Sequence, residues 1–310
     1  MTDIGLLCKS YAGDLAYATR MVSSFLRYNQ DELELFIVVP EKDLTSFTAL
    51  AGPHVTVLSE APFTQHFTQE PVLGIREGYI NQEIVKLAFW ELGILDNYFC
   101  VDSDAEFIRP FGRDDFLHDA TTPYSVLVED NELKVEPTYY REYWKSREAA
   151  LRRIQSEVGL DDRIIRTCHG HQIFSDIVLS TFRDDFLRPR GWSYLDALRV
   201  APYEFSWYNM WLQKAEPIPI HQREPLIKVF HHQDQHLEYL LRGVSLADMA
   251  RGYVGVVVNS NYSRDMGVVD ADATPAASLS RYLSYGTVGR VLLEKMKATY
   301  RRRLTRRSAL

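Results

Sequence analysis

The sequence predicts an α/β fold in which a mixed, mainly parallel sheet is flanked by helices. Short apolar runs at Asp3–Ser10, Leu35–Val39 and His54–Glu60 read as buried strands, and a segment with helical periodicity separates the first two. Strands that alternate with helices form parallel sheets, because each parallel connection must cross a sheet face. The 310 residues, 46% of them hydrophobic and 25% charged, are enough for one large or two small domains with a sizeable core.

The first half of the chain supplies the elements in order. The first helix spans Gly13–Asn29, because apolar side chains recur there at helical spacing: Leu15, Ala18, Val22, Phe25 and Leu26. Pro40 stops the second strand, and residues 62–78 show no period and read as a loop. A second amphipathic helix covers Tyr79–Gly93 and ends at its glycine. It leads directly into the apolar strand that begins near Tyr98.

The second half is less regular. Tyr124–Asp130 reads as a strand, Thr138–Leu160 as a long charged helix, and Ala250–Ser263 contains a further strand. His169–Leu187 fits either a strand or a helix. We find no internal repeat and no low-complexity linker, so a continuous α/β unit with a C-terminal helical tail is the simplest interpretation.

Charge and cysteine content exclude several classes of protein. A net charge of -7 argues against general nucleic-acid binding, which leaves a basic footprint. The 3 cysteines, Cys8, Cys100 and Cys168, match neither a disulfide framework nor a zinc module. The N-terminus lacks the pattern of a signal peptide, and no apolar stretch reaches the roughly 18 residues of a membrane span. We therefore expect a cytoplasmic protein.

Two aspartates follow the apolar strand in NYFCVDSDAEFIRPF, residues Asn97–Phe111. Asp102 and Asp104 lie close to each other at the strand's carboxyl end, where ligands bind in open parallel sheets. Like charges this close repel unless a cation neutralises them, and Mg²⁺ or Mn²⁺ prefers carboxylate and phosphate oxygens. The pattern favours a metal–diphosphate site; the alternative is a solvated turn.

These motifs, together with KSYAGDL near the N-terminus and the later YEFSWYNMW, resemble nucleotide-sugar glycosyltransferases of the GT-A fold. More narrowly, the chain is similar to a poorly characterised bacterial group of glycosyltransferase-like proteins with an Asp-Ser-Asp strand end. The resemblance covers residues 3–235 and is most specific between Gln82 and Pro110. It implies a Rossmann-like GT-A domain with a nucleotide-sugar-binding half at 1–110, an acceptor-binding half at 111–260 and a basic helical tail at 261–310.

The resemblance also implies a function: metal-dependent transfer of a sugar from a nucleoside diphosphate, most simply a UDP-sugar, to an acceptor hydroxyl. A glycan or glycolipid of bacterial surface polysaccharide assembly is the expected acceptor, and Mn²⁺ or Mg²⁺ the expected cofactor. Whether the enzyme inverts or retains configuration stays open. The alternatives are a nucleotidyltransferase, which should carry a Gly-rich loop after its first strand, and a non-catalytic glycan-binding domain of GT-A type.

On the donor side, the resemblance makes Asp104 a direct metal ligand, Asp102 a water- or ribose-mediated one, and His231 a third ligand. Gln82 and Lys86 share a helix face and would contact the donor; Lys86 could instead extend along the helix to water. Lys9 and Tyr11 follow the first strand, in the segment expected to hold the nucleobase and ribose. The neighbouring Asp14 is a candidate for the same role, but on sequence grounds we expect it to cap the first helix instead.

On the acceptor side, Glu204 lies among aromatic residues, where desolvation perturbs a carboxyl group as acid–base work requires. We expect it to deprotonate or position the acceptor hydroxyl; the alternative is an aromatic core segment with an exposed glutamate. Trp207 and Tyr208 are candidate sugar platforms, and His171 is a weaker acceptor-side candidate. The cationic segment 294–307 predicts either a peripheral contact with the inner face of the membrane or a solvated helix end.

Overall fold

A computed structural model gives the fold of the chain and describes residues 3–128, 137–168, 170–231 and 233–258, with a few positions between 289 and 300. The prediction of a helical, basic tail at 261–310 falls almost wholly outside these residues. No helix in the described ranges is both long enough and apolar enough to cross a bilayer.

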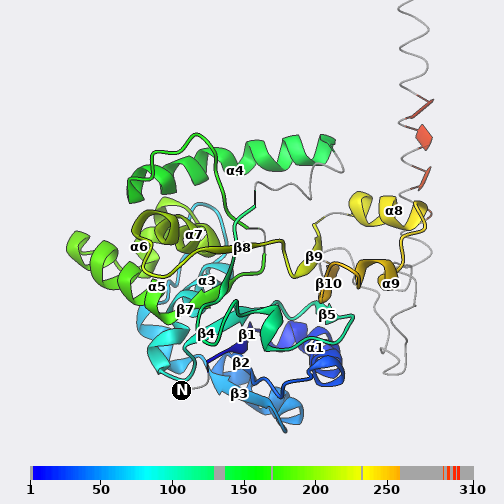
Figure 1. The fold of residues 1–310 in the computed structure, drawn as a ribbon, viewed down its shortest axis with the longest axis horizontal. Helices are drawn as coiled ribbons and strands as arrows, with labels where there is room; N and C mark the ends of the chain where they lie inside the picture. The colour runs from blue at the N-terminus through cyan, green and yellow to red at the C-terminus, as the bar shows by residue number, and fades with distance from the viewer. Residues whose placement is uncertain are drawn as a thin grey trace, which may run out of the picture.

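The central sheet has 5 strands in the order β3-β2-β1-β4-β7 (Figure 1). In that order their bounds are Val55–Ser59, Leu35–Val39, Gly5–Lys9, Asn97–Cys100 and Ile173–Ser175. The first four strands pair in parallel, whereas β7 runs antiparallel to β4 at the edge. The predicted mixed, mainly parallel sheet flanked by helices is therefore confirmed.

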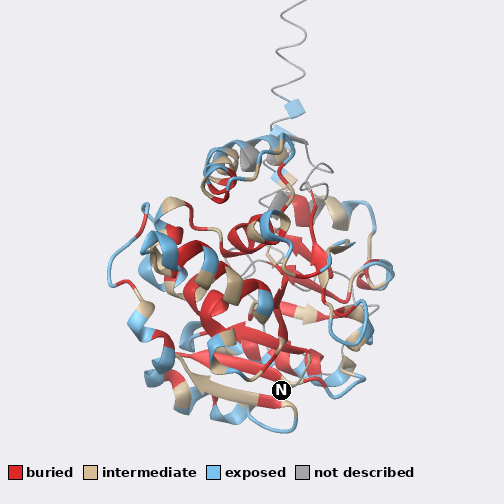
Figure 2. Cartoon of the chain, turned by 60° about the vertical axis from the view of Figure 1, so that its left-hand side comes forward, coloured by how far each residue is buried: buried red, intermediate tan, exposed pale blue. Residues whose placement is uncertain are grey.

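Side chains that alternate along each strand divide the core into two clusters, one on each face of the sheet. Leu7 of β1 belongs to one cluster, whereas Leu6 and Cys8 belong to the other. The Leu7 face is covered by α3 (Glu77–Ala88), α4 (Pro137–Val158), α5 (Asp176–Thr181), α6 (Tyr194–Val200) and α7 (Glu204–Ala215). The Leu6 face is covered by α1 (Leu15–Tyr28) and α2 (Leu44–Phe47). Figure 2 shows the strands of this sheet as mostly buried, with β3 largely intermediate.

Two small sheets complete the fold. In the first, β10 (Gly255–Val258) lies between β5 (Ala105–Phe107) and β9 (Ile227–Phe230). The short helices α8 (Gln233–Leu241) and α9 (Leu246–Met249) lie beside it in Figure 1. In the second, β6 (Tyr124–Val126) pairs in parallel with β8 (His221–Arg223). A short turn joins β4 to β5, so the first small sheet begins directly after the carboxyl end of β4.

Local expectations are confirmed with a few exceptions. The helix expected at Tyr79–Gly93 is α3 followed by a 3₁₀ turn, and it ends at Gly93 with a φ of 63°, a conformation that suits glycine. The ambiguous segment 169–187 contains both forms, because β7 leads directly into α5. Leu26, expected on the buried face of α1, is 47% exposed; the buried stripe is instead Ala18, Met21, Val22 and Phe25.

The order of the strands determines where a ligand can bind. From β1 the chain winds to β2 and β3 on one side, and it then returns to place β4 on the other side of β1. In open α/β sheets, the carboxyl ends of the strands at such a reversal form the binding crevice. Here the residues at that edge are Ser10 and Tyr11 after β1, and Asp102 and Asp104 after β4.

Candidate functional site

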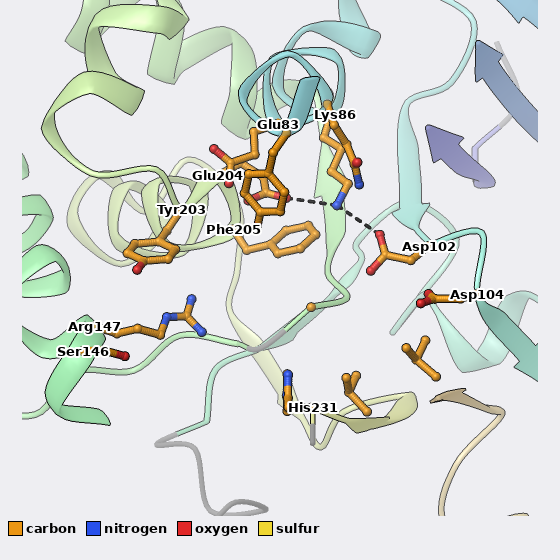
Figure 3. Close-up of a pocket in the computed structure, with 15 residues that line it drawn as sticks. Glu83, Lys86, Asp102, Asp104, Ser146, Arg147, Tyr203, Glu204, Phe205 and His231 are labelled. Atoms are coloured by element: carbon orange, nitrogen blue, oxygen red, sulfur yellow. Dashed lines mark hydrogen bonds and ion pairs between the residues drawn. The ribbon is translucent and has the colours of Figure 1, made fainter. Parts of the chain in front are cut away.

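Two adjoining cavities lie at the carboxyl ends of β1 and β4. The larger, about 390 Å³, is bordered by α3, the middle of α4, the start of α7, the residues that follow β4, and the end of β9 with the residue after it (Figure 3). The smaller, about 290 Å³, extends from the end of β1 beneath the start of α3. Tyr79 and Gln82 of α3 line both cavities. Both volumes fall near the range of small-molecule sites, so together they offer an elongated site with two compartments.

The Asp-Ser-Asp segment forms a tight turn between β4 and β5. The Ala105 N–H donates to the carbonyl of Asp102 at 3.0 Å, which closes the turn. Asp102 and Asp104 both line the larger cavity, with His231 pointing toward it from the opposite side in Figure 3. Both carboxylates border a cavity that the buried Lys86 also lines. The position agrees with the predicted metal–diphosphate site, and the role itself stays a prediction.

Lys86 lies in the wall of the larger cavity. Its side chain is 5% exposed, and its Nζ lies 3.0 Å from Glu204 Oε1 and 3.3 Å from Asp102 Oδ1. The ammonium also lies over the Phe205 ring, 4.6 Å from its centroid. The alternative in which Lys86 extends to water is therefore wrong. Burial lowers the pKa of Lys86, but Asp102 and Glu204 outweigh that effect and raise it well above its usual value. Lys86 is a permanent cation.

Glu204 is the first residue of α7 and is buried. Its carboxylate accepts a hydrogen bond from the Lys86 ammonium at 3.0 Å and lies at the amino end of α7, where the helix dipole is positive. Because Glu204 lines the cavity, the alternative of an exposed glutamate on an aromatic core segment is wrong. The position agrees with the predicted acid–base role, and the role itself stays a prediction.

Glu83 is a cavity residue that the sequence analysis missed. It lies one helical turn before Lys86 on α3 and is 1% exposed. Burial and the charge of Glu204 raise the pKa of Glu83 well above its usual value, despite the opposing effects of Lys86 and Arg147. The sequence contained a sign of this role. Position 83 shares the apolar helix face of Ile80, Ile84 and Leu87, where burying a carboxyl group costs free energy.

The smaller cavity contains the residues predicted to hold the nucleobase and ribose. Lys9 is 7% exposed, pairs with Glu60 at 2.9 Å, and donates to the Ser10 carbonyl at 3.0 Å. Tyr11 lies at the rim with 44% of its surface exposed. Lys9 and Tyr11 line this cavity, and Gln82 lies where it meets the larger one. The predicted donor residues thus lie along one continuous site.

Three acceptor-side candidates lie in the core, and their predicted contacts with an acceptor are corrected here. Trp207 is fully buried and donates its indole N–H to the Ala201 carbonyl at 2.9 Å. The Tyr208 hydroxyl accepts from the Ser175 N–H at 3.0 Å. His171 is 4% exposed beneath Asp102. None of the three lines either cavity. Trp207 and Tyr208 lie in the first half of α7, where every residue is buried.

Asp14 also has a different role from the expected one. It stands at the N-cap of α1, but its side chain makes no capping hydrogen bond. Its carboxylate instead accepts from the Ser103 hydroxyl at 3.2 Å, in the middle of the Asp-Ser-Asp turn. Burial raises the pKa of Asp14. This hydrogen bond joins the loop after β1 to the loop after β4. The first loop lines the smaller cavity and the second lines the larger one.

The side chains that line the larger cavity include groups that could hold a divalent cation. In the described residues, no three His, Cys, Asp or Glu side chains are arranged to enclose a metal ion. Asp102 already faces Lys86 and, at 3.7 Å, His171 Nε2. Mg²⁺, however, commonly takes one or two carboxylates and completes its shell with water and substrate phosphates. Asp102 and Asp104 on one cavity wall fit that mode, whereas an all-protein cage including His231 is not formed.

The burial of His171 beneath Asp102 can be tested without any ligand. Burial lowers the pKa of His171 to about 4, although Asp102 opposes the shift. Between pH 6.5 and 4 the unfolded chain binds a proton that the folded chain does not, so the free energy of unfolding falls as the pH falls. We expect His171→Gln to remove about 3 kcal/mol of this decline, at 1.36 kcal/mol per pKa unit.

The measurement is urea unfolding at pH 4 to 7 in EDTA, with the exposed His118→Gln as the control variant. Equal slopes in wild type and His171→Gln would contradict the buried, neutral imidazole.

The chain is similar to one family of proteins and to a solved structure. The model of a family described as "Family of unknown function (DUF6492)" matches residues 4–238. No curated protein matches the chain. Among solved structures, the chain is similar to the apo form of mouse xyloside xylosyltransferase 1, with 14% identity and a TM-score of 0.47. That alignment covers 83% of this chain and 98% of the mouse chain.

Proposed function

This chain belongs to the family of unknown function DUF6492, and on the geometry of its cavities we propose that it is a metal-dependent glycosyltransferase. It would move a sugar from a nucleoside diphosphate, most simply a UDP-sugar, to an acceptor hydroxyl. The resemblance of its motifs supports a glycan or glycolipid acceptor in bacterial surface polysaccharide assembly, with the reaction on the cytoplasmic side of the membrane. Mn²⁺ or Mg²⁺ is the proposed cofactor.

One observation carries the proposal: the two cavities meet at Gln82 and Tyr79, on the edge where β1 and β4 end. The smaller cavity offers an aromatic ring, Tyr11, and polar groups suited to a base and ribose. The larger offers paired carboxylates and a buried ammonium, which suit a cation, a diphosphate and a sugar. A nucleoside diphosphate sugar is a ligand whose parts follow in this order.

The residues of the larger cavity can divide the chemistry of transfer among them. Asp102 and Asp104 would hold the cation, which, when bound, neutralises charge on the leaving diphosphate. Lys86 is held in place by two carboxylates and by Phe205, so its fixed positive charge acts without reorganisation when the leaving group becomes more negative. Glu204, on the far side of Lys86 from Asp102, is the proposed proton acceptor for the incoming hydroxyl.

A nucleotidyltransferase is less well supported. Such an enzyme would need backbone N–H groups after β1 to hold a triphosphate. Here the Ala12 N–H already donates to Asp43 Oδ2 at 2.9 Å, and the turn Ala12–Asp14 is a 3₁₀ helix whose end packs toward Ser103. The loop contains a single glycine, Gly13.

The proposal is tested by incubating the protein with UDP-, GDP- and dTDP-sugars in Mn²⁺ or in EDTA and measuring release of the nucleoside diphosphate. We expect metal-dependent release from one nucleotide class, with water as a slow acceptor, and its loss in Glu204→Gln. The exposed Glu224→Gln is the matched control and should keep the wild-type rate. Pyrophosphate release from a nucleoside triphosphate plus a sugar phosphate would instead indicate a nucleotidyltransferase. Nucleotide binding without turnover would indicate a binding domain.

A further inference from the structure

Glu83 and Glu204 bring two carboxyl groups into contact in the wall of the larger cavity. Glu83 comes from α3 and Glu204 from the start of α7, and both are at least nine-tenths buried. Figure 3 shows their side chains next to each other, on the opposite side of Lys86 from Asp102. The charged and ionisable groups that face Glu83 come from three helices: Tyr79 and Lys86 from α3, Arg147 from α4 and Glu204 from α7.

The hydrogen bonding of this pair requires a proton. Within the described part of the chain, no hydrogen-bond donor reaches either carboxyl oxygen of Glu83. Its carboxyl group instead lies against that of Glu204 (Figure 3). Two carboxylates only accept hydrogen bonds, so this contact forms only when one of the two groups carries a proton. Burial and the nearby charge of Glu204 act in the same direction, because both oppose ionisation of Glu83 and raise its pKa.

The surrounding charges show which group carries the proton. Glu204 forms an ion pair with the Lys86 ammonium at 3.0 Å and lies at the amino end of α7. Glu83 has no such ion pair within hydrogen-bonding distance in the described residues, and Arg147 stacks on the Tyr203 ring at 4.3 Å. The proton therefore resides mainly on Glu83, which donates it to Glu204.

We propose that Glu83 and Glu204 form a carboxyl pair that shares one proton and accepts a second from the acceptor hydroxyl. This inference rests on the proposed sugar transfer. The acceptor O–H proton passes to the Glu204 carboxylate, and the acceptor oxygen forms a bond to the anomeric carbon. The bond from that carbon to the phosphate oxygen breaks, and its electron pair leaves with the diphosphate. The doubly protonated pair returns one proton to water after product release.

Glu83 acts through Glu204 and is thus a positioning residue. It makes the pair titrate in two steps that belong to both groups. Below the first step both carboxyls are protonated and cannot accept a proton. Above the second step both are ionised, and the extra negative charge opposes a diphosphate donor. Transfer is therefore expected to show a bell-shaped dependence on pH, with both limbs set by the pair.

The first test needs no substrate: the infrared spectrum of the folded protein at neutral pH. We expect a carbonyl band from a protonated carboxyl group that is absent in Glu83→Gln and unchanged in the exposed control Glu224→Gln. ¹³C-glutamate labelling should shift this band, which separates it from buried aspartates. Identical bands in wild type and Glu83→Gln would overturn the shared proton. If Glu83→Gln does not fold, a band in wild type that ¹³C-glutamate fails to shift overturns it equally.

The second test is the pH profile of sugar-nucleotide hydrolysis. Glu83→Gln keeps a hydrogen-bond donor beside Glu204 but cannot ionise, so the alkaline limb of its pH profile should disappear. Glu204→Gln should lose about 100-fold or more, the usual contribution of a general base, and still bind nucleotide. An alkaline limb retained in Glu83→Gln would overturn the role of the pair. Failure of wild type to bind any nucleotide would instead overturn the proposed function, whatever the infrared result.

Discussion

Lys86→Met is expected to destabilise the protein by about 3–5 kcal/mol, the largest effect of any single substitution in the site. The substitution removes the ammonium that lies within 3.3 Å of Asp102 and 3.0 Å of Glu204. These two carboxylates and Glu83 would then share a buried space without their central cation. The measurement is the free energy of unfolding in urea at pH 7, in EDTA.

Two further variants make this result specific. Lys214→Met, at an exposed position on the last turn of α7, is the matched control and should change stability by about 0.5 kcal/mol or less. Lys86→Met combined with Glu204→Gln should recover about 1–3 kcal/mol of the loss, because it removes one of the stranded charges. A loss below about 1 kcal/mol in Lys86→Met would contradict the assignment of Lys86 as the cation that holds the cavity together.

Asp104→Asn is expected to abolish stabilisation of the protein by a metal–nucleotide complex. A ligand at 100 times its Kd adds about 2.7 kcal/mol to the free energy of unfolding. Loss of a carboxylate ligand should weaken the complex by about 100-fold, which removes most of that gain. The measurement is the shift in the thermal midpoint on adding UDP and Mn²⁺. A shift in Asp104→Asn equal to that of wild type would show that Asp104 holds no metal.

The sequence predicted the parts of the molecule that depend on neighbours along the chain. The apolar runs predicted β1 to β4, Gly93 predicted the end of the α3 segment, and Asp102 and Asp104 predicted the sheet edge at which the larger cavity lies. These features follow from local periodicity and turn chemistry, so a short window of residues contains the information.

The features that were missed or wrong depend on contacts between distant segments. Lys86 and Glu204 are 118 positions apart, and only the packing of α7 against α3 shows that they meet. The same packing places Glu83 beside Glu204. Trp207 and Tyr208 are buried because α7 is enclosed by neighbouring helices and the sheet, and an aromatic helix reads alike whether it lines a sugar site or a core. Asp14 contacts Ser103, a partner 89 positions away, so its local preference for capping is overridden.

The measurement that tests the central claim most directly is calorimetric titration of UDP, GDP, CDP and dTDP into the protein, with Mn²⁺ and with EDTA. Wild type and the exposed control Asp114→Asn are expected to bind one nucleotide in Mn²⁺ and to lose that binding in EDTA. Asp104→Asn is expected to show no such metal-dependent binding. If folded wild-type protein supplied with Mn²⁺ binds none of the four nucleotides, the two cavities do not form a nucleotide-sugar site and the proposed function is wrong.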